Sequence, residues 1–457
     1  MRVRGIHGIL MIAFAFGSAA AGAQPFGLGG DARVDPTDFE VTTFANGLDF
    51  PVGMAVLQDG SLLVGVNTPP SGGNYFGASG ALRRLVDADD DGIADGAGIL
   101  LYTNLPGFTT AVRLAGHLVF VASGSCVISV LRQGATPASP LVLAGSLSLS
   151  FPVGWSHNVA NLTVRDAPGQ PGRYEVYFNI GSKANNLASA MLIPISGLVV
   201  ANASADSLYR VIIDDTGPSL SASGLVQIAS GLRNSFGAAF EPSSGDLYLQ
   251  DNGIDGLIDV NEPLSADELN RIPAASIGGA VEHFGFPQRY VVYRTGALFG
   301  SGGIDPAIAF QPVPMPNGAE SEGAADVVFA PARFPVGLRE GIFVGFHGRF
   351  SSVGLANEEN PLVYVDLAEA KHFHFIENNE PIIGHPDTLA VSADSLFVAD
   401  FSNASGLSTA GSGAIYRIRA LPSAVPALPF AGLALLIGLL MLAGSVLLRH
   451  TFRPSGA

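Results

Sequence analysis

One pattern recurs six times along this chain: an apolar segment of four residues, a turn, and a second apolar segment of five or six residues. Short apolar runs separated by Gly, Asp, Asn or Ser predict β-hairpins. The copies start 50 to 89 residues apart. They are Met54-Ala-Val-Leu with Ser61-Leu-Leu-Val-Gly, Ala111-Val-Arg-Leu with His117-Leu-Val-Phe-Val-Ala, Asn161-Leu-Thr-Val with Glu175-Val-Tyr-Phe-Asn-Ile, Gly237-Ala-Ala-Phe with Asp246-Leu-Tyr-Leu-Gln, Asp326-Val-Val-Phe with Gly341-Ile-Phe-Val-Gly, and Thr388-Leu-Ala-Val with Ser395-Leu-Phe-Val-Ala.

A third apolar segment follows each hairpin after a gap of variable length. The six are Leu82-Arg-Arg-Leu, Val127-Ile-Ser-Val-Leu, Leu208-Tyr-Arg-Val-Ile, Leu269-Asn-Arg-Ile, Leu362-Val-Tyr-Val and Ile415-Tyr-Arg-Ile. Units of this kind bury their faces against their neighbours and close into a ring, which is a β-propeller. The sequence therefore predicts an all-β fold, a six-bladed β-propeller over residues 36–420. Two β-sandwich domains are the alternative, but they would not repeat one unit along the whole body.

A further strand is expected before the first copy, because Phe39-Glu-Val-Thr-Thr-Phe-Ala alternates with period two. We expect it to pair with Ile415-Tyr-Arg-Ile, which would complete the last blade and close the ring.

Charge and cysteine content limit the partners. The net charge is −16 and the only lysines are Lys183 and Lys371, so a surface that neutralises nucleic-acid phosphates is not expected. The single Cys126 cannot form an intramolecular disulfide, and its apolar neighbours predict a buried strand residue.

Both ends resemble targeting segments. Arg2, Arg4 and an apolar run before Ala21-Gly-Ala predict a signal peptide over residues 1–23. Residues 425–448 are uncharged and apolar and predict a transmembrane helix, with a basic cytoplasmic tail at 449–457. Together with Val425-Pro-Ala-Leu-Pro in the linker 421–430, this end resembles an exosortase-type sorting tag. The protein is then exported to the periplasm or cell surface, and the span is either removed or kept as an anchor.

Polar groups flank the hairpins, where a propeller carries its ligands. Residues before each hairpin should share one face of the ring. The groups are Ser156-His-Asn, Arg233-Asn, Asp251-Asn-Gly, His347-Gly-Arg and His385-Pro-Asp.

At these positions the chain resembles the soluble quinoprotein glucose/sorbosone dehydrogenases, over roughly residues 44–419. The resemblance is carried by His157-Asn-Val-Ala-Asn-Leu with Asn179-Ile-Gly-Ser, by Gly231-Leu-Arg-Asn-Ser-Phe-Gly, by Ala266-Asp-Glu-Leu-Asn-Arg-Ile, by Gly285-Phe-Pro and by Phe343-Val-Gly-Phe-His-Gly. Those enzymes are six-bladed propellers that oxidise sugars with pyrroloquinoline quinone (PQQ) and Ca²⁺.

The resemblance also implies roles for single residues. His157 would be the general base, Arg233 and Asn234 would hold the quinone, and the carbonyls of Gly253 and Ile254 would bind calcium. The chain departs from the family around Gly384-His-Pro, where a basic pair is expected and absent. Arg349 is the nearest substitute as a cofactor-binding residue.

An acidic loop gives a second metal signal. Asp87, Asp89, Asp91 and Asp95 occupy positions 1, 3, 5 and 9 of a calcium-loop pattern with Gly92 at position 6. The closing Glu is missing, because position 12 is Gly98. The sequence predicts a structural calcium site, with a solvated acidic turn as the alternative.

Two functions remain open. The first is an exported PQQ-dependent dehydrogenase acting on a sugar or alcohol. The second is a non-catalytic surface propeller that binds a glycan or a protein, in which His157 packs the channel wall and Arg233-Asn234 tie inner strands together. His347, His372, His374 and His385 are predicted to be structural or exposed.

Overall fold

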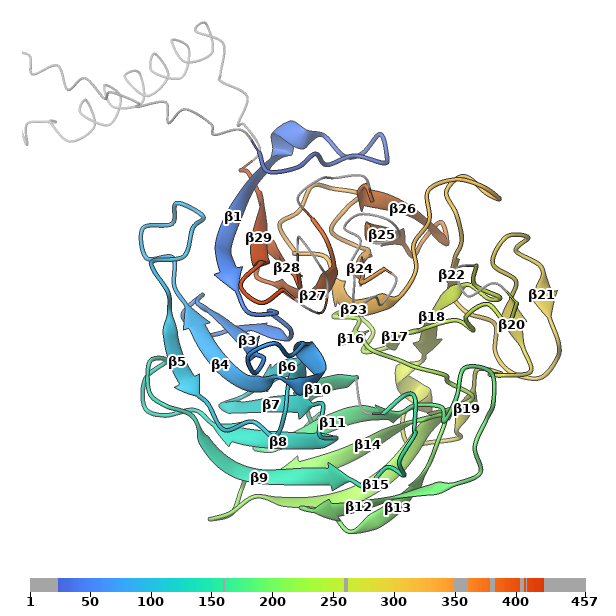
Figure 1. Cartoon of the computed structure of the whole chain (residues 1–457), viewed down its shortest axis with the longest axis horizontal. Coiled ribbons are helices and arrows are strands. Elements are labelled where there is room, and N and C mark those ends of the chain that lie inside the picture. Colours follow the sequence, from blue (N-terminus) through green and yellow to red (C-terminus); the bar gives the residue numbers. More distant parts are fainter. Residues whose placement is uncertain are drawn as a thin grey trace, which may run out of the picture. The chain divides into compact units, whose positions relative to one another are not determined.

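The computed structural model describes residues 24–158, 161–258, 262–348, 361–378, 383–402, 407 and 409–422. Within these ranges the chain forms six antiparallel blades around a central axis (Figure 1). The predicted signal peptide, Arg349, the predicted span 425–448 and the basic tail lie outside the described residues. In the described ranges no helix has the length and apolar character needed to cross a membrane.

Of the first three blades, blade 1 is four-stranded, and blades 2 and 3 carry additional strands. Blade 1 has β2 (Met54–Val56), β3 (Leu62–Thr68), β4 (Ser79–Leu85) and β5 (Ile99–Tyr102). Blade 2 has β6 (Thr109–Ala115), β7 (Leu118–Ser123), β8 (Val127–Arg132), β9 (Val142–Leu149), β12 (Leu192–Gly197) and β13 (Ala201–Ser204). Blade 3 has β10 (Leu162–Asp166), β11 (Arg173–Ile180), β14 (Ser207–Asp214), β15 (Ser221–Ser230) and β19 (Glu282–His283).

The last three blades are four-stranded. Blade 4 has β16 (Ala238–Phe240), β17 (Leu247–Asp251), β18 (Asp267–Ile272) and β22 (Ile308–Phe310). Blade 5 has β23 (Ala324–Phe329), β24 (Ile342–Phe346), β25 (Leu362–Asp366) and β26 (Lys371–Ile376). Blade 6 has β27 (Pro386–Val391), β28 (Ser395–Asp400), β29 (Gly413–Ala420) and β1 (Phe39–Leu48).

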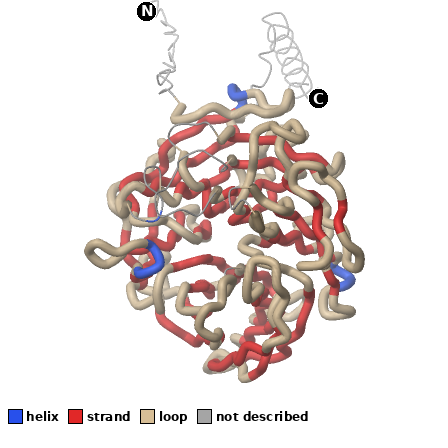
Figure 2. Tube along the Cα trace, turned by 45° about the vertical axis from the view of Figure 1, so that its right-hand side comes forward, coloured by secondary structure: helices blue, strands red, loops and turns tan. Residues whose placement is uncertain are grey.

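Other regular structure is sparse, as Figure 2 shows from a second direction. A small hairpin pairs β20 (Tyr290–Val291) with β21 (Leu298–Phe299). The 3₁₀ helices of the described part are η1 (Pro36–Asp38), η2 (Tyr75–Gly77) and η3 (Ala274–Ser276).

The six predicted hairpins and the six predicted third strands are confirmed as the first three strands of each blade. The innermost strands touch in the order β2, β6, β10, β16, β23, β27 and back to β2, which closes the ring. Strands such as β7 and β17 are buried at every position because each blade is covered on both faces by its neighbours. This is why they read as continuous apolar runs in the sequence.

The ring closes as the sequence predicts. β1 pairs antiparallel with β29, with Phe39 opposite Ala420 and Ala45 opposite Ile415. Phe39 is 2% exposed and its ring meets those of Phe334 and Phe375 edge-on, at centroid distances of 5.2 and 5.8 Å. Full burial of a phenylalanine contributes about 1.5–3 kcal/mol, so this contact fixes the closing strand.

Two local features differ from expectation. The hairpin β12–β13 lies between β11 and β14 in the sequence but pairs with β9, so it belongs to blade 2 and ties blades 2 and 3 together. Cys126 is not a buried strand residue. It is partly exposed in the turn between β7 and β8 with φ at +58°, a conformation that ends the strand.

Candidate functional site

A cavity of about 730 Å³ lies on the propeller axis. Its wall is made by the starts of the innermost strands and the ends of the second strands, so the residues before each hairpin do share one face. Each of the five polar groups named from the sequence contributes at least one residue. The polar and charged residues of the described lining are Thr110, Arg113, Ser156, His157, Asn158, Asn185, Arg233, Asn234, Asn252, Asp255, Ser265, Asp267, Tyr293, Glu322, Asp326, His347, Asp387 and Thr388.

His157 stands in the loop that leads into β10, and its ring position is fixed by a short relay. Its Nδ1 lies 2.7 Å from Ser182 Oγ, and Ser182 Oγ donates to the carbonyl of Ala184 at 2.7 Å. Because the single hydroxyl proton is used in that second bond, Nδ1 must carry the proton and donate to Ser182. The unprotonated nitrogen is therefore Nε2, which has no protein partner among the described residues.

The electrostatics keep this imidazole neutral. Burial, together with the positive charge of Arg233, lowers the pKa of His157 to about 3. A neutral ring with a free lone pair on Nε2 can accept a proton or a hydrogen bond from a ligand in the cavity.

Asp251 shapes the turn that carries Arg233 and Asn234. This buried carboxylate accepts the backbone N–H of Arg233 at 2.8 Å and that of Asn234 at 2.7 Å. Ser235 adds a third hydrogen bond from its hydroxyl. Burial raises the pKa of Asp251 to about 7. Arg233 and Asn234, which precede β16, are thus held by Asp251 at the end of the neighbouring strand β17.

The Arg233 guanidinium is buried and already has protein partners. Its Nε donates to the Asn185 carbonyl at 2.8 Å, and Nη2 donates to Asn185 Oδ1 and to Asp255 Oδ2 at 2.9 and 2.8 Å. Nη1 has only a 3.5 Å contact with the Asn252 carbonyl. The Asn234 side chain has no hydrogen bond within the described residues. Arg233 therefore does tie loops of two blades together and keeps one nitrogen for a ligand.

Gly253 and Ile254, predicted as a pair, differ in their placement. Gly253 lines the cavity, and a Cβ there would lie 2.3 Å from the Ser265 carbonyl, so the close approach requires glycine. Its carbonyl accepts no hydrogen bond from the described residues. The Ile254 carbonyl instead accepts from the N–H groups of Leu264 and Ser265 at 2.9 and 3.2 Å. The Ile254 carbonyl thus already has two protein donors, and calcium binding by Gly253 and Ile254 stays a prediction.

The structure adds two features that the sequence did not predict: a contact between two of the named polar groups, and one further residue. His347 and Asp387 meet at 2.6 Å in the cavity wall, and the His347 ring stacks on His385 at 4.6 Å. His347 was expected to be structural or exposed; its place after the fifth hairpin was the signal for a site. The second feature is Arg113, which lines the cavity from inside β6. A charge within an otherwise apolar hairpin segment was the signal there.

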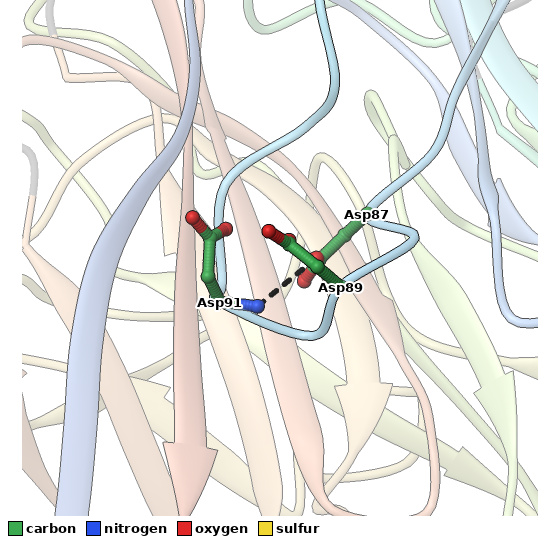
Figure 3. A group of neighbouring side chains, drawn as sticks. All are labelled: Asp87, Asp89 and Asp91. Carbon is green, nitrogen blue, oxygen red and sulfur yellow. Dashed lines mark hydrogen bonds between the residues drawn. The ribbon is translucent and has the colours of Figure 1, made fainter. Parts of the chain in front are cut away.

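The acidic loop lies elsewhere, at the seam between blades 1 and 6. Asp87, Asp89 and Asp91 place oxygens within 4.8 Å of one another (Figure 3). Asp95 is not in this cluster, because its carboxylate accepts the N–H of Ala88 at 2.7 Å. Asp87 also pairs with Arg417 of β29 at 2.8 Å. This ion pair connects the loop to β29, which pairs with β1 to close the ring. Calcium binding by the loop stays a prediction.

Comparison with known proteins leaves the sequence family open. No protein-family model matches the chain. An uncharacterised protein of Borreliella burgdorferi is 47% identical over 60 residues, a match that covers 13% of this chain and 14% of that protein.

Solved structures are similar over most of the length. The PQQ domain of pyranose dehydrogenase from Coprinopsis cinerea matches with TM-score 0.55 and 15% identity, covering 87% of this chain and 98% of that domain. The PQQ-bound aldose sugar dehydrogenase from Streptomyces coelicolor matches with TM-score 0.53 and 17% identity, covering 84% and 99%.

The chain shares its fold with these sugar dehydrogenases. A calcium structure of a carbohydrate-active enzyme of family AA12 from Trichoderma reesei has the same fold, with TM-score 0.54, 16% identity and coverage of 87% and 100%. At such identities the likeness concerns the fold, and the function has to be judged from the cavity itself.

Proposed function

We propose that this protein is an exported quinoprotein-type dehydrogenase that oxidises a hydroxyl group of a sugar or related alcohol in the axial cavity. The observation that supports this most strongly is His157. Its ring is held through Nδ1–H and Ser182, and Nε2 remains as an acceptor at the cavity wall. Oxidation of an alcohol requires such a base for the hydroxyl proton.

His157 would take the hydroxyl proton of the substrate on Nε2. Ser182 and the Ala184 carbonyl keep the ring in the required tautomer, so no reorientation is needed when the proton arrives. General-base catalysis of this kind accelerates a reaction about 10²–10⁴-fold.

The residues fit a calcium ion next to the base. The Gly253 carbonyl accepts no hydrogen bond from the described residues, and Asn252 Oδ1 is buried without a partner. Both residues line the cavity. Two oxygens without donors, beside the carboxylate of Asp255, form a donor set that suits Ca²⁺.

The residues also fit an anionic cofactor at the same wall. When bound, pyrroloquinoline quinone would supply the hydride acceptor. Arg233, through its little-used Nη1, and the Asn234 side chain would orient it. Arg349 stays a candidate for the same role. The solved relatives with this fold include PQQ-bound proteins, which supports the assignment.

Export and anchoring belong to the same proposal. The signal peptide (1–23) would direct the chain to the export machinery. The linker and sorting motif (421–430), the span (425–448) and the basic tail would engage a sorting system or the membrane. The propeller would then meet its sugar or glycan outside the cytoplasm, in the periplasm or at the cell surface.

A non-catalytic glycan- or protein-binding propeller is the second candidate. It is favoured by the charge of the described lining, where Asp255, Asp267, Glu322, Asp326 and Asp387 face two guanidinium groups. Each guanidinium already has a carboxylate partner. An uncharged glycan would tolerate this lining better than a tricarboxylate.

The test uses the purified protein with PQQ, Ca²⁺ and an artificial electron acceptor over a panel of aldoses. We expect dye reduction, and we expect His157→Ala to lower turnover about 10²–10⁴-fold with little change in PQQ affinity. His283→Ala is the matched control, because His283 is exposed and lies outside the cavity lining. Glycan binding without PQQ binding or turnover would establish the second candidate instead.

A further inference from the structure

Arg113 and Asp326 form an ion pair across the propeller axis. Arg113 lies in β6 of blade 2 and Asp326 in β23 of blade 5, 213 residues apart, with Nη2 and Oδ1 separated by 2.6 Å. Because the innermost strands contact one another in the order β2, β6, β10, β16, β23, β27, blades 2 and 5 stand opposite each other (Figure 1). The pair therefore bridges the central channel.

The pair makes the floor of the cavity. The lining residues at and before β6 are Phe108, Thr110, Ala111 and Arg113, and those at and before β23 run from 322 to 326. Arg113 and Asp326 are the last members of these runs. A ligand that fills the cavity would meet the guanidinium at its inner end.

Arg113 has more donor capacity left over than Arg233. Its Nη1 bonds only the carbonyl of the adjacent Val112, at 3.1 Å, and its Nε has no partner among the described residues. The Arg113 side chain is 16% exposed, compared with 4% for Arg233. Arg113 is thus the more accessible of the two guanidinium groups in the described lining.

Asp326 keeps two backbone hydrogen-bond donors if Arg113 moves away. Its Oδ1 also accepts the N–H of Val327 at 2.9 Å, and its Oδ2 accepts the N–H of Leu389 at 3.1 Å. Burial raises the pKa of Asp326 although Arg113 lowers it, so when the guanidinium turns away the carboxyl is held by these two backbone donors and takes up a proton more readily. Nearby, Thr110 sits in a β-bulge of β6, and its Oγ1 is buried without a partner.

We propose that Arg113 is an anion-binding residue at the floor of the cavity, where its guanidinium binds a carboxylate group of the bound ligand in place of, or beside, Asp326. It supplies from blade 2 the positive charge that the chain lacks around Gly384 in blade 6. The inference rests on the proposed function only in that the quinone is one of its probes. A carboxylate of a sugar acid would be held by the same contact.

The test measures binding to the full-length protein by calorimetry, with three probes: PQQ, benzene-1,3,5-tricarboxylate and D-gluconate. We expect Arg113→Gln to weaken at least one probe about ten- to hundredfold, as loss of one charge-assisted hydrogen bond implies. Arg113→Lys should bind more tightly than Arg113→Gln. Asp326→Asn, which frees the guanidinium, should bind about tenfold more tightly than the wild type. Arg165→Gln is the matched control, because Arg165 also pairs with a shared carboxylate, Glu175, away from the cavity.

The outcomes separate this inference from the proposed function. If the quinone fails to bind while another carboxylate binds in an Arg113-dependent way, the dehydrogenase assignment is lost and the floor site stands. If every probe that binds the wild type binds Arg113→Gln and Asp326→Asn equally well, the floor site is overturned. If no probe binds the wild type, both are overturned.

Discussion

The depressed pKa of His157 predicts a specific loss of stability in mild acid. A histidine of the unfolded chain takes up its proton near pH 6.5, whereas folded His157 does so only near pH 3. Between these values the unfolded state binds more protons, so stability is complete above pH 6.5 and falls as the pH is lowered. From the two pKa values, His157 alone should cost about 2 kcal/mol of unfolding free energy between pH 7 and pH 5.

The assay is urea unfolding at pH 7, 6 and 5 of the wild type and of His157→Gln. Other buried histidines, such as His374 and His385, also have lowered pKa values, so the wild type will lose more than this amount in total. The difference between wild type and variant isolates His157. Equal pH dependence in the two proteins would refute the neutral, buried imidazole and with it the base assigned to this ring.

Four further predictions concern the surroundings of the cavity and the contact between blades 1 and 6. Ser182→Ala removes the acceptor of the His157 Nδ1 proton, so turnover should fall about tenfold while PQQ affinity is unchanged; steady-state kinetics with quinone titration checks this. Gly253→Ala forces a Cβ against the Ser265 carbonyl and should cost about 1–3 kcal/mol in stability and weaken calcium binding, measured by urea unfolding and calorimetry. Arg417→Gln leaves Asp87 with backbone donors alone and should destabilise the ring closure by about 1.5–3 kcal/mol. If the loop binds calcium, the ion should raise the wild-type melting temperature, and Asp89→Asn should abolish that part of the rise.

Local sequence determined the blades of this propeller. Each hairpin is encoded by two short apolar runs and the turn between them, because buried strands covered on both faces need apolar residues at every position. The closing strand could be predicted for the same reason: Phe39 to Ala45 had the alternation of a strand and no partner other than the last blade. Strand direction alone predicted that the residues before each hairpin share one face, whereas the structure showed that all five polar groups line one cavity.

Only the tertiary structure decided the chemistry of the cavity. Arg113 and Asp326 meet because two blades face each other across the axis, and a separation of 213 residues leaves no local pattern for that contact. Arg233 was predicted as a ligand-binding cation, yet most of its donors are taken by Asn185 and Asp255, from loops of two different blades. Gly253 and Ile254 were predicted together as carbonyl ligands of calcium. Only the structure shows that the Ile254 carbonyl accepts hydrogen bonds from the N–H groups of Leu264 and Ser265. Donors and acceptors form hydrogen bonds with the groups that lie near them in the folded chain, and closure of the ring determines which groups those are.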